Sequence, residues 1–240
     1  MNNFKLLSIV VPVYNEEKFI EETIKQILVA DTFTLKKEII VVDDASKDKT
    51  PSILKGLILK HKNLKVVFKK KNEGKGSVLK TGFSKTTGDI VLIQDADLEY
   101  SPSDYPSLIE PFLKSDADVV YGSRLSTTKP HRVLYFWHYI VNKSLTMFSN
   151  MLTNLNLTDM ETGYKVFRGD IIRKITPTLE SKRFGFEPEI TARIAKISSL
   201  RLFEVGISYS GRTYKDGKKI GWKDGLKAIW EIIKYNLLTS

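Results

Sequence analysis

The sequence predicts an α/β fold in which helices flank a mostly parallel, Rossmann-like sheet. The first half of the chain repeats one unit, a short run rich in β-branched residues followed by a turn and a helical pattern. This alternation is typical of parallel strands joined by crossover helices. The 240 residues are 42% hydrophobic, which suffices for one substantial core. Since no repeat, low-complexity tract or long linker divides the chain, we expect a single domain over residues 1–240.

The first-half elements follow from hydrophobic periodicity. Strands are expected at residues 8–13, 38–42, 64–68, 90–93 and 119–121. Helices are expected between them at residues 17–29, 51–61, 76–85 and 103–114. Thr50-Pro51 and Ser101-Pro102 resemble an N-cap followed by proline at the first helical position. Ligands collect at the carboxyl ends of strands in such sheets, so the polar residues at 14–17, 43–44 and 95–99 are the first candidates for function.

The second half changes character. Residues 130–157 form a long aromatic and apolar stretch without strand alternation. Within it, residues 132–155 combine aromatic residues and Met with scattered cations, which is typical of an amphipathic helix lying in a membrane interface. Short strands at 164–167 and 202–209 and helices at 188–196 and 223–238 complete the expected elements.

The C-terminal helix is a second candidate for the interface. Its apolar stripe is regular and narrow, which favours packing in the core instead. That stripe consists of Leu226, Ile229, Trp230, Ile233 and Leu237.

Composition and charge limit the kinds of site, partner and location that we expect for this protein. The formal charge of +10 favours anionic partners, although solubilising surface lysine explains it equally well. The absence of cysteine excludes disulfides, thiolate metal sites and cysteine nucleophiles. The first residues do not resemble a signal peptide, and the longest nearly apolar run, residues 133–141, is far shorter than the ~20 residues of a spanning helix. We therefore expect a cytoplasmic protein that does not cross a bilayer.

Asp95 and Asp97 flank Ala96 directly after an apolar strand. Two carboxylates this close repel each other in a partly dehydrated cleft, and a divalent cation relieves the repulsion. Oxygen ligands suit Mg²⁺ or Mn²⁺, and Glu99 could add a third carboxylate. A solvated acidic turn is the alternative interpretation of the same pattern.

Four segments in order resemble the motif set of family 2 glycosyltransferases, which have the GT-A fold. They are residues 9–17, 41–50, 72–76 and 95–97. Further along, the chain is similar to the polyprenyl-phosphate branch of that family, typified by dolichol-phosphate mannose synthase. The matching segments there are residues 122–124, 159–164, 204–207 and 212–219.

The resemblance implies a nucleotide-binding half at about residues 1–122 and an acceptor- and membrane-facing half at about 123–240. It implies that a nucleotide-sugar donor, GDP-mannose or a UDP-hexose, contacts Pro12, Tyr14, Glu16, Asp43, Asp44 and Ala96. Asp95, Asp97 and Glu99 would hold the Mg²⁺ or Mn²⁺ that bridges the diphosphate, although the family often has Gln at the position of Glu99. Basic side chains expected to clamp the diphosphate, partly from a lid at 211–219, are Lys182, Arg212 and Lys218.

On the acceptor side, the resemblance implies that Arg124 meets the phosphate of a dolichyl or undecaprenyl phosphate and, with Asp95 and Asp97, forms the catalytic set. A second arginine of the family and a serine four residues later have no counterpart. Their positions fall at His138 and Asn142, with Lys143 and Arg132 as alternative cations. A lipid phosphate is already anionic, so no strong base is needed and direct attack inverts the anomeric centre. The enzyme would bind the inner face of an anionic membrane peripherally.

Two other classes of function remain open. A related glycosyltransferase acting on a glycan or other hydroxyl would need a carboxylate base, for which Asp159, Glu161 and Glu187 are candidates. A non-enzymatic polyanion-binding protein would rely on charge alone. The Asp95 and Asp97 pair argues against that third class, and we expect no nucleic-acid partner.

Overall fold

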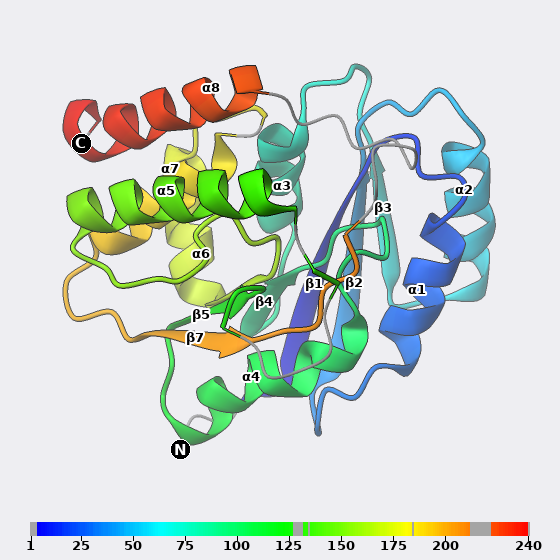
Figure 1. The fold of residues 1–240 in the computed structure, drawn as a ribbon. Helices are drawn as coiled ribbons and strands as arrows, with labels where there is room; N and C mark the ends of the chain where they lie inside the picture. Colours follow the sequence, from blue (N-terminus) through cyan, green and yellow to red (C-terminus); the bar gives the residue numbers. More distant parts are fainter. Residues whose placement is uncertain (1–3, 127–131, 134, 184, 212–221, 240) are drawn as a thin grey trace.

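The computed structural model describes residues 4–126, 132–133, 135–183, 185–211 and 222–239. Its centre is a seven-stranded sheet in the order β3-β2-β1-β4-β6-β5-β7 (Figure 1). The first four strands along the chain are parallel: β1 (Leu6–Val13), β2 (Lys36–Asp43), β3 (Leu64–Phe68) and β4 (Ile90–Ile93). β6 (Lys165–Arg168) runs antiparallel between β4 and β5 (Val119–Ser123), and β7 (Leu202–Gly206) is parallel to β5. The predicted mostly parallel sheet is confirmed.

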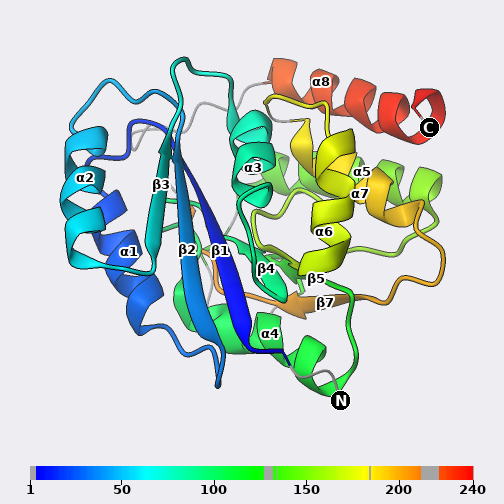
Figure 2. The same ribbon diagram turned by 180° about the vertical axis from the view of Figure 1, so that it is seen from behind.

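Helices cover both faces of the sheet, because alternate side chains of each buried strand point to opposite sides. Ile9 and Val11 of β1 pack with α1 (Ile20–Val29), α2 (Thr50–Lys60) and α4 (Tyr105–Lys114). Val10 packs on the other face, seen in Figure 2, whose core cluster contains side chains from several helices. These helices are α3 (Lys75–Phe83), α5 (Phe136–Thr153), α6 (Gly169–Ile175), α7 (Phe186–Ala195) and α8 (Trp222–Ile233), which continues as a π-helical turn at Lys234–Leu238.

Most expected elements are present, with shifted ends. The expected N-cap at Ser101 is confirmed, since its hydroxyl accepts from the Ser103 N–H at 3.3 Å. The same expectation for Thr50 is wrong: α2 begins at Thr50, whose N–H donates to the Asp48 carboxylate at 2.9 Å. The final strand ends at Gly206 instead of 209. α6 was not predicted, because seven residues are too few to display a helical period.

The expected core stripe of the C-terminal helix is also wrong. Ile229, Trp230 and Leu237 are 40 to 64% exposed, and the buried side chains are instead Ile232 and Tyr235. α8 packs against α5 and α7, and these contacts decide which of its side chains are buried. In the part of the chain that the structure describes, no helix combines the length and apolarity needed to span a membrane.

The loop between β3 and α3 lies backbone to backbone against residues 181–183. Gly74 has a φ of 95°, a conformation that favours glycine. A Cβ atom on Gly76 would lie 2.2 Å from the Ser181 carbonyl oxygen, and one on Gly74 would lie 2.5 Å from that of Lys182. The Ser77 N–H donates to the Lys182 carbonyl at 3.2 Å. Close approach of two backbones therefore requires both glycines.

We predict that Gly76→Ala lowers the free energy of unfolding by about 1–3 kcal/mol, because two backbone segments must separate to admit the methyl group. Urea denaturation measures the change. Gly56→Ala is the matched control: Gly56 lies in α2, and a Cβ atom on it would meet no other atom within 4 Å, so alanine should stabilise by about 0.5–1 kcal/mol. Equal effects of the two substitutions would contradict the close-packing interpretation.

Candidate active site

The polar residues predicted for function meet at one edge of the sheet. β2, β1 and β4 are neighbouring parallel strands, so their carboxyl ends lie side by side. Asp43 ends β2, Tyr14 follows β1, and Asp95 and Asp97 follow β4. Residues more than 80 positions apart in the chain are thereby brought to one place.

The adjacent acids Asp43 and Asp44 have different environments. Asp44 accepts hydrogen bonds from the N–H groups of Glu73 and Gly74, at 3.0 and 2.7 Å, and so organises the loop before α3. Asp43 Oδ2 accepts a long bond from the Ser46 N–H, at 3.3 Å, while its buried Oδ1 has no partner among the described residues. Burial raises the pKa of the Asp43 carboxyl. Asp43 therefore offers an acceptor to a ligand, whereas Asp44 is satisfied within the protein.

Hydrogen bonds hold the loops after β1 and β2 together. The Asn15 N–H donates to the Ser46 hydroxyl at 2.9 Å, and the Glu16 N–H donates to Thr50 Oγ1 at 3.0 Å. Pro12 lies within β1, and Tyr14 next to it exposes its ring beside the end of β2. The exposed ring and the unpartnered Asp43 oxygen together could contact the flat face and the N–H edge of a nucleobase.

Asp95 is one of three members of a partly buried ion-pair network. Lys75, at the first position of α3, places its ammonium 3.0 Å from Asp95 Oδ1 and 3.2 Å from Glu187 Oε1 at the start of α7. Burial alone would lower the pKa of Lys75, but the two carboxylates outweigh it and raise the pKa well above its ordinary value. Lys75 is therefore a permanent cation between two carboxylates. No role for Lys75 was predicted from the sequence, although it lies in the 72–76 motif.

The remaining acids after β4 fit a divalent cation only in part. Asp97 Oδ1 accepts from the Glu99 N–H at 3.2 Å, and Glu99 Oε2 accepts from the Tyr209 hydroxyl at 2.7 Å. Among the described residues no cluster of three His, Cys, Asp or Glu side chains has the spacing of a metal site. The carboxylate chemistry suits Mg²⁺ or Mn²⁺, but Asp95 is shared with Lys75, so substrate oxygens would have to complete the coordination. Metal ligation by Asp95, Asp97 and Glu99 stays a prediction.

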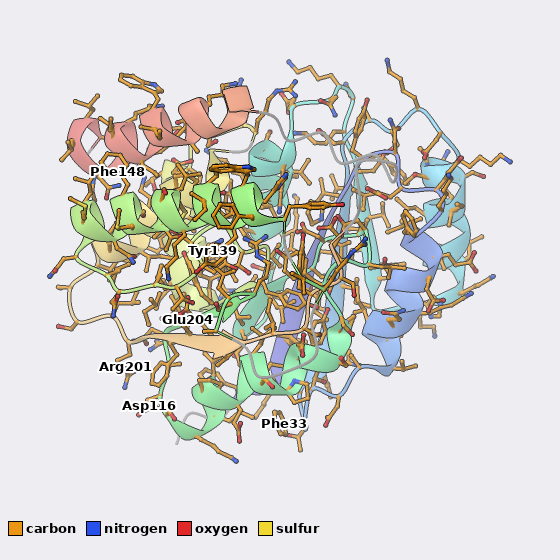
Figure 3. The ribbon with its side chains drawn as sticks, viewed as in Figure 1. Phe33, Asp116, Tyr139, Phe148, Arg201 and Glu204 are labelled. Carbon is orange, nitrogen blue, oxygen red and sulfur yellow. The ribbon has the colours of Figure 1, made fainter. Side chains whose placement is uncertain are left out.

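Arg124 is held rigidly at the carboxyl end of β5. Its Nε and Nη2 atoms each lie 2.7 Å from an oxygen of the buried Asp159, and its guanidinium carbon lies 5.3 Å from the centre of the Tyr209 ring. Glu204 on β7, labelled in Figure 3, accepts from the N–H groups of Thr158 and Asp159 and thereby holds that segment. With Nε and Nη2 bound to Asp159, the remaining N–H groups of this fixed guanidinium could donate to an oxyanion.

The other expected phosphate contacts lie on separate elements from Arg124. His138, Asn142 and Lys143 lie on the first half of α5, and the His138 ring centre is 6.1 Å from that of Tyr135. Lys182 lies beside the Gly74–Gly76 loop with an exposed side chain. Arg212 and Lys218 lie outside the described residues, and Ala96 is buried between the two acids.

A second buried cation occupies the floor of the site. Lys165, the first residue of β6, is fully buried, donates to the carbonyls of Met160 and Thr162, and lies 4.8 Å from the centre of the Tyr121 ring. Burial lowers the pKa of Lys165 to about 8, and burial raises the pKa of nearby Glu161 to about 7. No role for Lys165 was predicted; a lysine where an apolar strand residue is expected was its only signal.

The chain is similar to known proteins over nearly its whole length. The chain is 28% identical to UDP-N-acetylglucosamine--dolichyl-phosphate N-acetylglucosaminyltransferase of Methanococcus voltae, over 95% of both chains. It is also 28% identical to undecaprenyl-phosphate mannosyltransferase of Micrococcus luteus, over 95% of this chain and 97% of that one. Glucosyl-3-phosphoglycerate synthase of Mycobacterium tuberculosis, solved with Mn²⁺, UDP and phosphoglyceric acid, shares the fold with a TM-score of 0.70 at 19% identity, covering 98% of this chain and 78% of that one.

The family assignment rests on a match over most of the chain and not on any single motif. Residues 8–176 fit the family described as Glycosyl transferase family 2, a match that spans β1 to the end of α6 and includes every strand-end acid described above. The protein is therefore an enzyme of glycosyl transferase family 2.

Proposed function

We propose that this enzyme is a metal-dependent, inverting glycosyltransferase that moves a hexose from a nucleotide sugar to a polyprenyl phosphate at a membrane surface. The observation that carries the proposal is the placement of two different kinds of phosphate-binding group within one site. Acids suited to a cation follow β4, and the fixed Arg124 fork follows β5 on the other side of β6. The two relatives named above carry dolichyl-phosphate and undecaprenyl-phosphate transferase names, which supports this acceptor.

On the donor side, Asp43 Oδ1 and the exposed Tyr14 ring would bind the base. Asp97, with Asp95 and Glu99 beside it, would hold Mg²⁺ or Mn²⁺. When bound, such a cation neutralises the charge that grows on the departing diphosphate. The solved neighbour with Mn²⁺ and UDP supports this cofactor. Lys182, Arg212 and Lys218 would add positive charge around the same diphosphate.

On the acceptor side, Arg124 would orient the lipid phosphate, and His138, Asn142 and Lys143 would lie along its approach. The phosphate oxygen is already anionic at neutral pH, so the protein need not remove a proton from it. Attack on the anomeric carbon opposite the diphosphate inverts that centre. The protein's contribution is then to position two phosphates and to balance their charge.

Exposed apolar side chains on α5 and α8 support membrane binding. The two helices lie side by side in Figures 1 and 2 and are in contact; Tyr139 and Phe148 mark α5 in Figure 3. Exposed large side chains on this two-helix surface and just before it are Val133, Tyr135, Phe136, Trp137, Tyr139, Ile140, Val141, Met147, Met151, Ile229, Trp230, Leu237 and Leu238. Such a patch on one face, with Lys143 and Lys227 exposed beside it, suits the headgroup region of an anionic inner leaflet.

A glycosyltransferase acting on a hydroxyl acceptor is the second candidate. Asp159 is paired with Arg124 and Glu187 with Lys75, but burial raises the pKa of Glu161 to about 7, which suits a general base. A donor screen with Mg²⁺ or Mn²⁺ and undecaprenyl or dolichyl phosphate, followed by mass analysis of the organic extract, tests the primary proposal. Transfer only to water-soluble glycans would favour the second candidate instead.

Asp97→Ala should lower metal-dependent turnover by at least about 100-fold, because the charge on the leaving diphosphate would no longer be balanced in place. Its free energy of unfolding should change by only about 1 kcal/mol, since the side chain is partly exposed and the variant loses the hydrogen bond from the Glu99 N–H. Initial rates over a Mn²⁺ titration measure the loss. Glu110→Ala, which removes an exposed carboxylate from α4, is the control. Normal metal-dependent turnover in Asp97→Ala would remove Asp97 from the mechanism.

Arg124→Lys keeps the charge but loses the two-point contact with Asp159. We expect the apparent KM for polyprenyl phosphate to rise about tenfold, with less than about a twofold change for the nucleotide sugar. Arg168→Lys is the matched control, because Arg168 also pairs with carboxylates but at the opposite end of β6. A larger effect on the nucleotide sugar would assign Arg124 to the donor side.

Replacing Phe136 and Trp137 by Ser should reduce binding to anionic vesicles at least about tenfold, since these side chains are 65 and 73% exposed and would lose apolar contact with lipid. Nucleotide affinity should not change. Sedimentation with vesicles at physiological salt measures binding. The control replaces Val29 and Leu59, similarly exposed residues on α1 and α2 across the molecule. Wild-type protein that stays in the supernatant, or a double variant that pellets like wild type, would contradict membrane docking by α5.

A further inference from the structure

Glu161 lies on a turn between the donor and acceptor sides of the site. The turn joins Asp159, the partner of Arg124, to Lys165 at the start of β6. Because β6 is antiparallel to β4, the first residue of β6 lies beside the carboxyl end of β4, where Asp95 follows. A short turn thus connects the groups on the two sides of the site.

Hydrogen bonds and close packing hold this turn in place. The Lys165 ammonium donates to two of its carbonyls, those of Met160 and Thr162. The Gly163 N–H donates to the Tyr100 hydroxyl at 2.8 Å, and a Cβ atom on Gly163 would lie 2.4 Å from Asp95 Oδ2. The turn is therefore packed directly against Asp95, and Glu161 is presented from a fixed backbone.

Among the carboxylates around this turn, Glu161 differs from Asp159, Asp95 and Glu187 in having an unsatisfied atom. Asp159 is paired with Arg124, and Asp95 and Glu187 share Lys75. Glu161 Oε1 is buried and has no hydrogen-bond partner among the described residues. Burial, with a further contribution from Glu187, raises the pKa of this carboxyl to about 7. A buried polar atom without a partner is costly, and such atoms mark places where a ligand completes the hydrogen bonding.

Two considerations indicate which ligand Glu161 would bind: the charges around its carboxyl group and the position of the sugar during its transfer. The carboxylates of Glu187 and Asp159 act on Glu161, but the cations of Lys165 and Arg124 offset them, so this point carries little net charge. It therefore suits a neutral hydrogen-bonding group such as a hydroxyl better than a phosphate. In a direct transfer, the sugar lies between the leaving diphosphate and the attacking phosphate. Either protonation state of Glu161 can bond to a hydroxyl, since a carboxylate accepts and a carboxylic acid also donates.

We propose that Glu161 binds a hydroxyl or amide N–H group of the transferred sugar and thereby helps to select the donor. This inference rests on the proposed function, because it assumes a nucleotide-sugar donor. It adds a sugar-recognition residue outside the strand-end acids. Lys165 supports it as a positioning residue, since it holds the turn without facing the sugar.

Calorimetry with Mn²⁺ tests the proposal through pairs of ligands: UDP-glucose and UDP-N-acetylglucosamine against UDP, and GDP-mannose against GDP. In Glu161→Ala we expect the affinity for the preferred nucleotide sugar to fall about 10- to 100-fold, and in Glu161→Gln about three- to tenfold, because the amide keeps a weaker hydrogen bond. Affinity for the matching nucleoside diphosphate should not change. Glu231→Gln is the matched control, because Glu231 Oε2 is also buried without a described partner but lies on α8. Thermal unfolding confirms that each variant is folded, and the isosteric Gln variant serves if Ala does not fold.

The outcomes separate this inference from the function on which it rests. Wild-type enzyme that binds none of the three nucleotide sugars would overturn the proposed function and, with it, the role of Glu161. Wild-type binding that both Glu161 variants retain in full would overturn only the role of Glu161. Equal weakening of sugar nucleotide and nucleoside diphosphate would assign Glu161 to the diphosphate. Lost turnover at unchanged donor affinity would assign it to the acceptor, and either assignment overturns sugar recognition.

Discussion

The partly buried ammonium of Lys75 is the interaction on which the geometry of the site depends. It joins the start of α3 to Asp95 after β4 and to Glu187 at the start of α7. Removing this cation would leave two neighbouring carboxylates without their shared partner. The Gly74–Gly76 loop places Lys75 there, and that loop is in turn held by the Asp44 carboxylate and by residues 181–183. One cation therefore fixes the relative positions of three elements, of which α7 comes from the second half of the chain.

Charge within the site is balanced locally, although the chain as a whole carries +10. Arg124 is matched by Asp159 and Lys75 by Asp95 and Glu187. At this edge of the sheet, Asp43 and Glu161 each have a buried carboxylate oxygen without a hydrogen-bond partner among the described residues. Asp43 ends β2 and Glu161 precedes β6, and these two strands lie on opposite sides of β4, which Asp95 follows. A base at one end and a sugar at the other would satisfy both oxygens while the diphosphate lies near Asp97.

The second half of the chain uses its helices in two ways at once. α5 and α8 contribute Leu145 and Ile232 to the core cluster under them, yet both leave large apolar side chains exposed on the surface that they share. Each of these helices buries only a narrow apolar stripe, so it carries more hydrophobic surface than the sheet can cover. The same helices thus complete the core and supply a surface suited to lipid, close to the elements that carry Arg124 and Lys182.

The sequence by itself determined the strands, most of the helices and the strand-end positions of the candidate acids, because β-branched runs and polar strand ends are local patterns. Family membership followed from the same segments. Tertiary structure decided which acids are satisfied: the neighbours Asp43 and Asp44 look alike in sequence, but only Asp44 receives the N–H groups of a loop 29 and 30 residues away. It also decided which face of α8 is buried, since packing on α5 and α7 overrides a stripe counted at regular spacing. Hydrogen bonds and ion pairs between distant residues depend on the path of the whole chain, and no local pattern encodes them.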